Sequence, residues 1–213
     1  MSLARAARWL APLFLCATAC AANIEASIFS PTGQPVEDAA VVIEPVAGTT
    51  PRRQRTVTIE QRDRDFIPYV TVIQTGTLVE FPNRDPFKHH IYSFSPAKVF
   101  EIKLYADKPA LPVLFDKAGE VAIGCNIHDW MEAYILVVNS AYFAKTGHDG
   151  RAVVRDVPVG RYRLRVWHPR QKLEVSQREI EVGPGPAATK LDLVADVPAR
   201  ASKPKPAVES GKY

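Results

Sequence analysis

Apolar and polar side chains alternate with a period of two residues in several short segments of the chain. The clearest are 70–72, 100–104 and 161–166, where every second residue is aliphatic or aromatic. This period is typical of β-strands that bury one face, and no segment shows a convincing amphipathic-helix period. The side chains expected to face the core are Val70, Val72, Phe100, Ile102, Leu104, Tyr162, Leu164 and Val166. Turn signals containing glycine separate the segments, so the pattern predicts an all-β sandwich.

The two ends of the chain depart from this pattern. A basic stretch precedes a short apolar run that ends in small residues, which is the order of a secretory signal peptide. We therefore expect residues 1–22 to be removed on export to the periplasm, and the run is too short to span a membrane. Lipid anchoring at Cys20 is the less favoured alternative, because no leucine stands where such signals usually carry one. Residues 198–213, rich in Pro, Ala, Lys and Ser, predict a disordered tail.

Composition and charge exclude several classes of function. The 213 residues are 46% apolar and 23% charged, which is ordinary for a globular protein. The formal net charge of +4 is too small and too evenly spread to indicate nucleic-acid binding. We find no carboxylate pair suited to acid–base catalysis, no Ser-His-Asp arrangement and no phosphate-binding loop in the sequence, so we do not expect an enzyme.

One short segment gathers side chains that bind metals. Cys125 is the only cysteine beyond the predicted signal peptide, Met131 is the only methionine besides the initiator, and His128 stands between them in a C-x2-H-x2-M spacing. Upstream, His89 and His90 lead into another expected strand. Because neighbouring residues of a strand point to opposite faces, only one of these two should reach a shared metal. A thiolate, two imidazoles and a thioether form the ligand set of a blue copper site, whereas zinc gains little from a thioether.

Each of these residues also has a plainer interpretation. Cys125 could be a small buried apolar residue, Met131 a filler of the core and His128 a surface residue. Their occurrence within seven residues, together with the upstream histidines, favours a metal site over three separate structural roles.

Several segments together resemble the cupredoxins. They are Phe66–Pro68, Gly76–Asn83, the segment around His89, Phe115–Gly119 and the C-x2-H-x2-M loop. The resemblance covers about residues 56–138, and the short ligand loop is most similar to that of the amicyanin branch. It implies a Greek-key β-sandwich that binds one mononuclear type 1 copper through His89, Cys125, His128 and, axially, Met131.

The chain departs from the cupredoxin pattern at two positions beside the expected ligands. His90 stands where the family usually has an asparagine that ties the ligand loops together. Asp129 lies beside His128, in surroundings that are commonly apolar in the family. The first departure bears on the hydrogen bonds around the ligands and the second on the docking face.

The flanking segments resemble a different fold. Ile24–Glu44 and Thr146–Pro169 are similar to the first and last parts of a carboxypeptidase-regulatory-like, or transthyretin-like, sandwich. Each part alone has too few strands to be stable. We therefore predict one small β-sandwich made of residues 23–54 and 139–197, interrupted by a cupredoxin domain at residues 55–138.

The function that these observations predict is that of an exported blue copper protein. It would carry single electrons between redox partners, and the overall arrangement resembles exported proteins labelled methylamine-utilisation proteins. We expect electrons to pass through His128, with Ile127 and Trp130 forming a small contact patch. The alternatives are a copper-free β-sandwich interaction module and a periplasmic copper-storage or chaperone protein.

Overall fold

The computed structural model describes residues 21–53, 55–107, 109, 111–172, 177–183 and 189–198. They form seventeen β-strands and no helix, which confirms the all-β prediction. This part of the chain accordingly holds no helix long and apolar enough to cross a membrane. The first 20 residues of the predicted signal peptide and all of the predicted tail except Pro198 lie outside the described residues. Ala21 and Ala22, counted with the signal peptide in the prediction, belong to the first strand.

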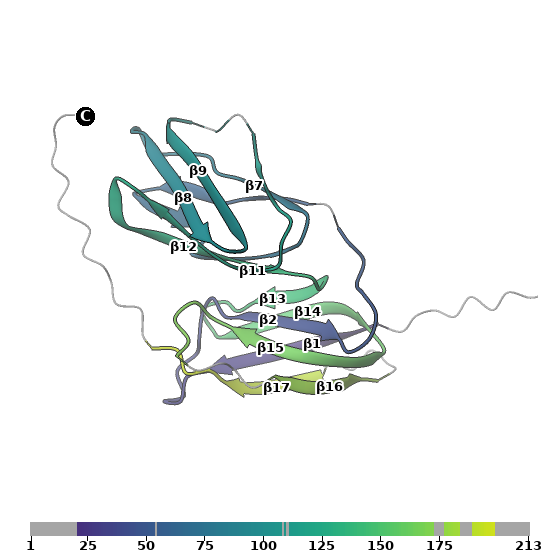
Figure 1. The fold of residues 1–213 in the computed structure, drawn as a ribbon. Coiled ribbons are helices and arrows are strands. Elements are labelled where there is room, and N and C mark those ends of the chain that lie inside the picture. Colours follow the sequence, from purple (N-terminus) through teal and green to yellow (C-terminus); the bar gives the residue numbers. More distant parts are fainter. Residues whose placement is uncertain are drawn as a thin grey trace, which may run out of the picture.

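Two sheets formed from the two ends of the described chain make the lower half of the molecule in Figure 1. Their strands are β1 (Ala21–Phe29), β2 (Ala40–Pro45), β13 (Tyr142–Lys145), β14 (Arg151–Pro158), β15 (Gly160–Trp167), β16 (Arg178–Val182) and β17 (Thr189–Val194). One sheet has the order β14-β1-β17 and the other β13-β2-β15-β16. Side chains of both sheets share one apolar core. The predicted burial of Tyr162, Leu164 and Val166 on β15 is confirmed.

The upper half is built from the middle of the chain. Its strands are β3 (Thr56–Thr58), β4 (Glu60–Arg62), β5 (Asp65–Ile67), β6 (Val70–Gln74), β7 (Thr77–Glu80), β8 (His89–Ser95), β9 (Lys98–Tyr105), β10 (Val113–Phe115), β11 (Gly119–Cys125) and β12 (His128–Val138). They form a sheet of order β6-β12-β11-β8-β9, a sheet of order β10-β7-β3 and the hairpin β4-β5. A second core, with Phe81, Phe115 and Ile135 among its members, lies inside this half.

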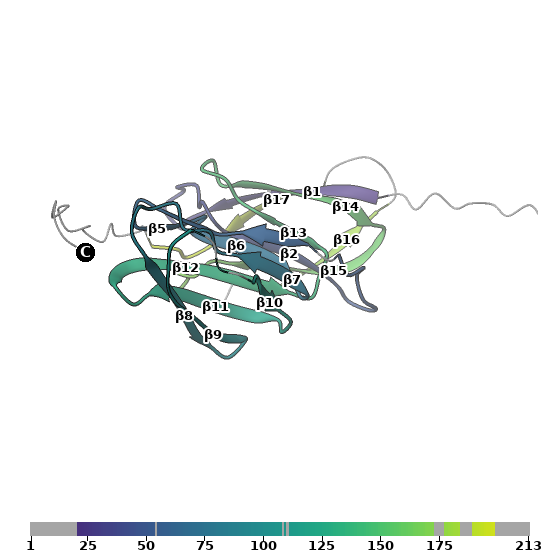
Figure 2. The same cartoon turned by 90° about the horizontal axis from the view of Figure 1, so that it is seen from above.

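A third apolar cluster joins the two halves. Val42 and Trp167 from the lower half pack there with Val70 from β6, and Val72 lies against the same cluster. The opposite face of β6 is also covered, since Thr71 is only 7% exposed. The prediction that segment 70–72 buries a single face is therefore wrong, because the second half of the molecule covers the face that would otherwise meet solvent. Figure 2 shows β6 lying beside β13 and β2 when the molecule is seen from above.

Strand β9 contains a β-bulge close to one end. His89 lies opposite Tyr105 and Ile91 opposite Ile102, so β9 has one residue more than β8 in this interval. The bulge turns Tyr105 towards the core and leaves Leu104 54% exposed. The prediction that Leu104 faces the core is therefore wrong, although the two earlier inward positions of β9 do pack against it.

The segment between the two halves on the N-terminal side contains no strand over residues 46–53. The proposed division into a discontinuous sandwich, 23–54 with 139–197, and an inserted domain, 55–138, stays a prediction that an excision experiment can test.

Candidate metal centre

Three of the four predicted ligands come together where β8, β11 and β12 begin or end. His89 is the first residue of β8, Cys125 the last of β11 and His128 the first of β12. The Nδ1 atoms of both histidines lie 3.7 Å from Cys125 Sγ, and one donor atom from each residue lies within 4.8 Å of the others. His89 is fully buried, Cys125 is 3% exposed and His128 is half-buried. Among the described residues, no other group of three or more His, Cys, Asp or Glu side chains is close enough together to hold a metal ion.

The residues of the C-x2-H-x2-M spacing lie around the turn between β11 and β12. Cys125 pairs with His128 whereas the preceding Gly124 pairs with Glu132, so three residues of β12 bulge out between the two pairs. Met131 is the last of these three, is 2% exposed and packs in the same core cluster as Cys125. The bulge thus places the predicted fourth ligand inside the protein, beside the loop that carries the other two.

The distances between donor atoms fit a bound metal ion. Ligand bonds of about 2.3 Å to sulfur and about 2.0 Å to nitrogen separate the two donors by about 3.5 Å at a tetrahedral angle and about 3.7 Å at a trigonal angle. The observed separation is 3.7 Å for both histidines. The three side chains therefore leave the space that a metal between them would need.

The surroundings of Cys125 favour its thiolate form. Burial alone would raise the pKa of this thiol, but hydrogen bonding with His89 and with the backbone N–H groups of His90 and Ile127 outweighs burial and lowers the pKa. The thiolate is the form that binds metals. The lowered pKa therefore favours the form of Cys125 that a soft metal ion would bind.

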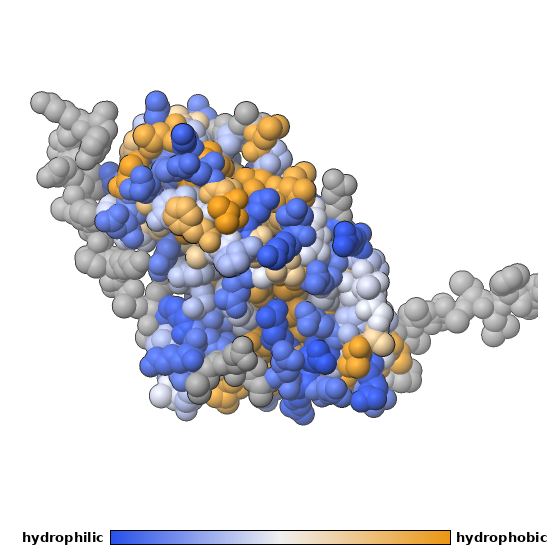
Figure 3. Space-filling view, in the orientation of Figure 1, coloured by the Kyte–Doolittle hydropathy of each residue, from blue (hydrophilic) through white to orange (hydrophobic). Residues whose placement is uncertain are grey.

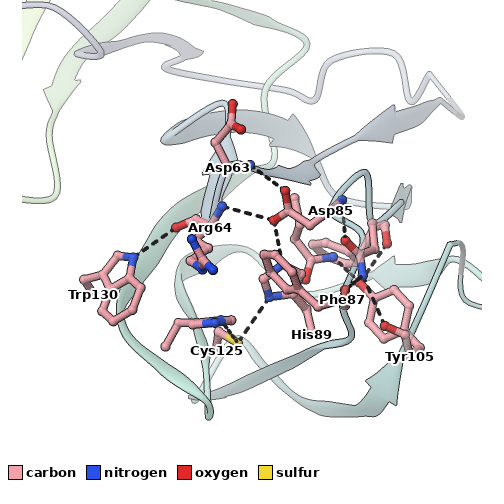
Figure 4. Close-up of polar contacts among 12 residues, drawn as sticks. Asp63, Arg64, Asp85, Phe87, His89, Tyr105, Cys125 and Trp130 are labelled. Atoms are coloured by element: carbon pink, nitrogen blue, oxygen red, sulfur yellow. Dashed lines mark hydrogen bonds and ion pairs between the residues drawn. The ribbon is translucent and has the colours of Figure 1, made fainter. Parts of the chain in front are cut away.

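Asp85 holds His89 from the side opposite Cys125 (Figure 4). Its Oδ2 lies 2.8 Å from His89 Nε2 and accepts a hydrogen bond from the Arg64 backbone N–H, while Oδ1 accepts one from the Asp63 N–H. Burial alone would raise the pKa of Asp85, but these hydrogen bonds lower it. Burial likewise would lower the pKa of His89, and its contacts with Cys125 and Asp85 raise it instead. The contact of Nε2 with Asp85 therefore fixes the ring of His89 with its Nδ1 directed towards Cys125 Sγ.

The two backbone amides that Asp85 binds belong to the tip of the hairpin β4-β5. Asp63 and Arg64 have φ angles of 55° and 58°, in the left-handed region that residues other than glycine seldom adopt. The carboxylate of Asp85 satisfies both N–H groups of this turn. Sequence reasoning missed Asp85, and the only available signal was a carboxylate four residues before His89.

Asn83 ties the ligand loops together. Its Nδ2 donates to the Phe87 and Tyr105 carbonyl oxygens at 2.7 and 3.2 Å, and its Oδ1 accepts from the Asp85 N–H at 2.9 Å. The segment before β8 is thus linked to the end of β9. An asparagine therefore ties these segments here, at position 83, although position 90 is a histidine.

His90 points away from the donor group. Its Nε2 lies 3.0 Å from Glu101 Oε1, and its ring centroid lies 6.0 Å from that of Tyr92. The alternation of side chains along β8 therefore brings His89 and not His90 to Cys125, in agreement with the sequence argument.

Aromatic rings enclose His128 on two sides. Its ring centroid lies 5.8 Å from that of Phe87 and 5.2 Å from that of Trp130, and the Arg64 guanidinium lies 4.7 Å from the Phe87 centroid. Trp130 Nε1 donates to the Arg64 carbonyl oxygen at 3.2 Å. Burial lowers the pKa of His128, and neighbouring positive charges lower it further. A lowered pKa favours the neutral imidazole, which is the form that binds metals.

The chain has few recognisable similarities to known proteins. No protein-family model and no curated protein matches the chain. Similar solved structures include a Cu(I) form of an amicyanin mutant, with a TM-score of 0.35, 15% identity, and coverage of 39% of this chain and 82% of the other. A purple cupredoxin from Nitrosopumilus maritimus has a TM-score of 0.34 and 22% identity over 38% and 98% of the two chains. A copper-containing nitrite reductase from Thermus scotoductus has a TM-score of 0.37 and 24% identity. The match covers 53% of this chain and 28% of the other.

All three superpositions are poor and all three identities are low. Similarity at this level carries no inference about a metal, so any metal assignment rests on the donor atoms of the chain itself.

Proposed function

We propose that this chain is an exported type 1 copper protein that carries single electrons between redox partners and is not an enzyme. The observation that supports this most strongly is the placement of two imidazole nitrogens 3.7 Å from Cys125 Sγ. In the proposal, His89, Cys125 and His128 would be the three strong ligands of one mononuclear site, and buried Met131 would supply a weak fourth. Export rests on the signal-like sequence of residues 1–22.

The donor set favours copper over zinc. Thiolate and thioether sulfur suit Cu(I), and imidazole accepts either oxidation state, whereas zinc gains little from the thioether. Copper, when bound, supplies the one-electron chemistry. The chain shields and restrains one donor in particular: His89 is fully buried and its Nε2 lies 2.8 Å from Asp85 Oδ2, so its ring would move little between oxidation states. A rigid ligand set needs little rearrangement when an electron arrives or leaves.

We place the electron port at His128, since its ring is the imidazole of the donor group with exposed surface. Ile127 beside it is 47% exposed and suits a small, transient contact. Trp130, the expected contact residue, also packs against the core and donates to the Arg64 carbonyl, so a charge there would disturb the site itself. Ile127→Lys is the sharper test: it should slow electron exchange with a c-type cytochrome and leave the absorption spectrum unchanged.

Addition of Cu(II) to the purified metal-free protein tests the metal assignment. One equivalent should produce an intense blue colour, because a thiolate bound to Cu(II) gives a strong charge-transfer absorption. Cys125→Ser should remain colourless and lose most of the affinity for copper, because the soft anionic donor is gone. A colourless wild-type protein that holds one zinc tightly would overturn the proposal.

The domain organisation is tested by excision. Residues 55–138 would be replaced by a short flexible linker that joins the flanking segments. If the flanks form one sandwich, the shortened protein should unfold cooperatively in urea, as followed by circular dichroism. An insoluble product or one without a cooperative transition would favour a single fused β-structure.

A further inference from the structure

A groove of about 320 Å³ lies between the lower and the upper half of the molecule. Strands β13 and β14 line it from the lower half, and β3, β6 and the start of β7 line it from the upper half. Figure 1 shows β13 at the top of the lower half, next to the upper half. None of the four proposed metal ligands lines this groove, so it is a separate candidate for binding.

The charged side chains of the groove are mostly cationic. Arg53, Arg55 and Arg155 line it and are exposed, whereas Asp156 is the only acidic residue of its lining. Among the described residues, none of the three guanidinium groups makes an ion pair. Three positive charges against one negative charge, without a counter-ion from the chain, favour an anionic ligand.

A buried glutamine holds the segment that carries two of these arginines. Gln74, the last residue of β6, is 4% exposed. Its Oε1 accepts from the Arg53 backbone N–H at 3.0 Å, and its Nε2 donates to the Pro51 carbonyl oxygen at 3.0 Å. The Arg55 carbonyl oxygen accepts from the Leu78 N–H at 2.9 Å. Both arginines therefore extend from a backbone that is fixed to the upper half.

A β-bulge in β14 brings the third arginine to the groove. Arg155 and Asp156 together lie opposite the single residue Asn23 of β1, and the Asp156 N–H donates to Asn23 Oδ1 at 3.3 Å. In a regular strand, two consecutive side chains would point to opposite faces of the sheet. Because of the bulge, both residues are exposed and both line the groove.

Much of the remaining lining is apolar. Tyr142 and Phe143 on β13 are half-buried, and Val153 on β14 is 38% exposed. On the face seen in Figure 3, hydrophilic side chains cover more of the lower half than of the upper half. Aromatic and aliphatic side chains beside three arginines therefore differ from the surface of the lower half that is visible there.

We propose that this groove binds a small organic oxyanion that joins a phosphate or carboxylate head group to an apolar body. Guanidinium groups bind both kinds of head group through paired N–H donors. The aromatic and aliphatic side chains would cover the apolar body. A volume of about 320 Å³ is close to the lower end of the range for ligand pockets and suits one small molecule. Because both halves line the groove, a bound ligand would contact both.

Titration calorimetry on the purified metal-free protein at low ionic strength tests this, with phenyl phosphate as the probe. Phenyl phosphate should bind about tenfold more tightly than inorganic phosphate, which lacks the apolar body. Benzyl alcohol, which lacks the charge, should not bind. Phenyl phosphate should also raise the urea midpoint of unfolding, because a ligand that binds only the folded state stabilises it.

Two substitutions with opposite expected effects locate the site. Arg155→Gln should weaken binding of phenyl phosphate by about tenfold. Asp156→Asn should strengthen it several-fold, because the negative charge is lost and asparagine tolerates the φ angle of 57° at this position. The matched control is Arg151→Gln, since Arg151 is an exposed arginine of the same strand that does not line the groove. It should bind as the wild type does.

A second pair of variants leaves every arginine in place. Val153→Asp adds a carboxylate to the groove and should weaken binding of phenyl phosphate, whereas Val159→Asp, at a valine outside the groove that is 48% exposed, should not. Vesicles that contain phosphatidylglycerol distinguish a lipid from a free anion, and they should not compete with phenyl phosphate.

The proposal is overturned if the wild-type protein does not bind phenyl phosphate or binds inorganic phosphate equally well. It is also overturned if the control variants lose as much affinity as Arg155→Gln and Val153→Asp, or if Asp156→Asn weakens binding. Binding of the vesicles that is lost in Arg155→Gln would show a membrane-binding surface instead. None of these measurements depends on the proposed metal centre.

Discussion

Replacement of Asp85 by asparagine should destabilise the protein although this side chain is not a metal donor. The carboxylate is 6% exposed and makes three hydrogen bonds, with His89 Nε2 and with the backbone N–H groups of Asp63 and Arg64. Asparagine has nearly the same shape but no charge, and only its Oδ1 can accept. At least one of the three donors therefore loses its acceptor.

The magnitude follows from the hydrogen bonds that are lost. A hydrogen bond to a charged group contributes about 1.5–3 kcal/mol, and a buried donor left without a partner costs about 1–3 kcal/mol. The two N–H groups also belong to residues with positive φ, a conformation that costs about 1–2 kcal/mol for a residue other than glycine. We expect Asp85→Asn to lower the free energy of unfolding by about 2–4 kcal/mol.

Urea unfolding of the metal-free protein, followed by tryptophan fluorescence, measures this change. Asp116→Asn is the matched control, since its carboxylate is 66% exposed and lies 3.7 Å from Lys98 Nζ. An exposed ion pair contributes about 0–1 kcal/mol, so the control should unfold almost as the wild type does. If Asp85→Asn unfolds within 0.5 kcal/mol of the control, about the scatter expected for an ordinary surface change, the reasoning about this carboxylate is refuted.

Three further predictions concern single histidines and the methionine. In copper-loaded protein, His89→Ala should lose the blue absorption while His90→Ala keeps it, and the opposite result would show that the ligand is misassigned. Met131→Leu should keep copper but raise the reduction potential, measured by voltammetry; complete loss of copper would instead favour a Cu(I) storage or chaperone site. Burial, with the charge of Arg170, lowers the pKa of His168 to about 4. The unfolded chain therefore binds more protons between about pH 6.5 and 4, and acidification through this window should cost up to about 3 kcal/mol of stability in the wild type. The metal-free His168→Gln variant should lack this part of the pH dependence, and an unchanged pH dependence of its urea midpoint would contradict the assignment.

The sequence predicted those parts of the fold that depend on local periodicity. Tyr162, Leu164 and Val166 alternate with exposed or half-buried arginines because β15 is regular over this stretch and these three side chains face the core between the two lower sheets. The pattern failed at Leu104, where a bulge in β9 changes the direction of the side chain. It also failed at β6, where both faces are buried: Val70 and Val72 pack against strands distant in sequence, and Thr71 on the opposite face is only 7% exposed. A two-residue alternation of apolar and polar positions in the sequence indicates neither a bulge nor a packing partner from a distant segment.

In the candidate site, too, the sequence predicted what lies close together along the chain and missed what depends on distant segments. Cys125, His128 and Met131 lie on one loop, so the rarity of sulfur-containing residues and their spacing were enough to predict them as ligands. The contacts that fix His89 could not be found in this way, because they depend on how the hairpin tip meets the segment before β8. Asp85 became visible only when both segments were placed in space.

His89 is the proposed ligand that lies far from the others in sequence, so the precision of the site depends on what holds this one ring. Nδ1 faces Cys125 at 3.7 Å and Nε2 faces Asp85 at 2.8 Å. Asp85 is held in turn by the hairpin tip and, through its own N–H, by Asn83, which also binds the end of β9. A continuous set of hydrogen bonds therefore joins hairpin β4-β5 to the ring of His89, whose Nδ1 is a proposed metal ligand. Asp63 supplies no metal ligand, but its backbone N–H belongs to this set of hydrogen bonds. A substitution at Asp63 should for this reason alter the site through the position of His89.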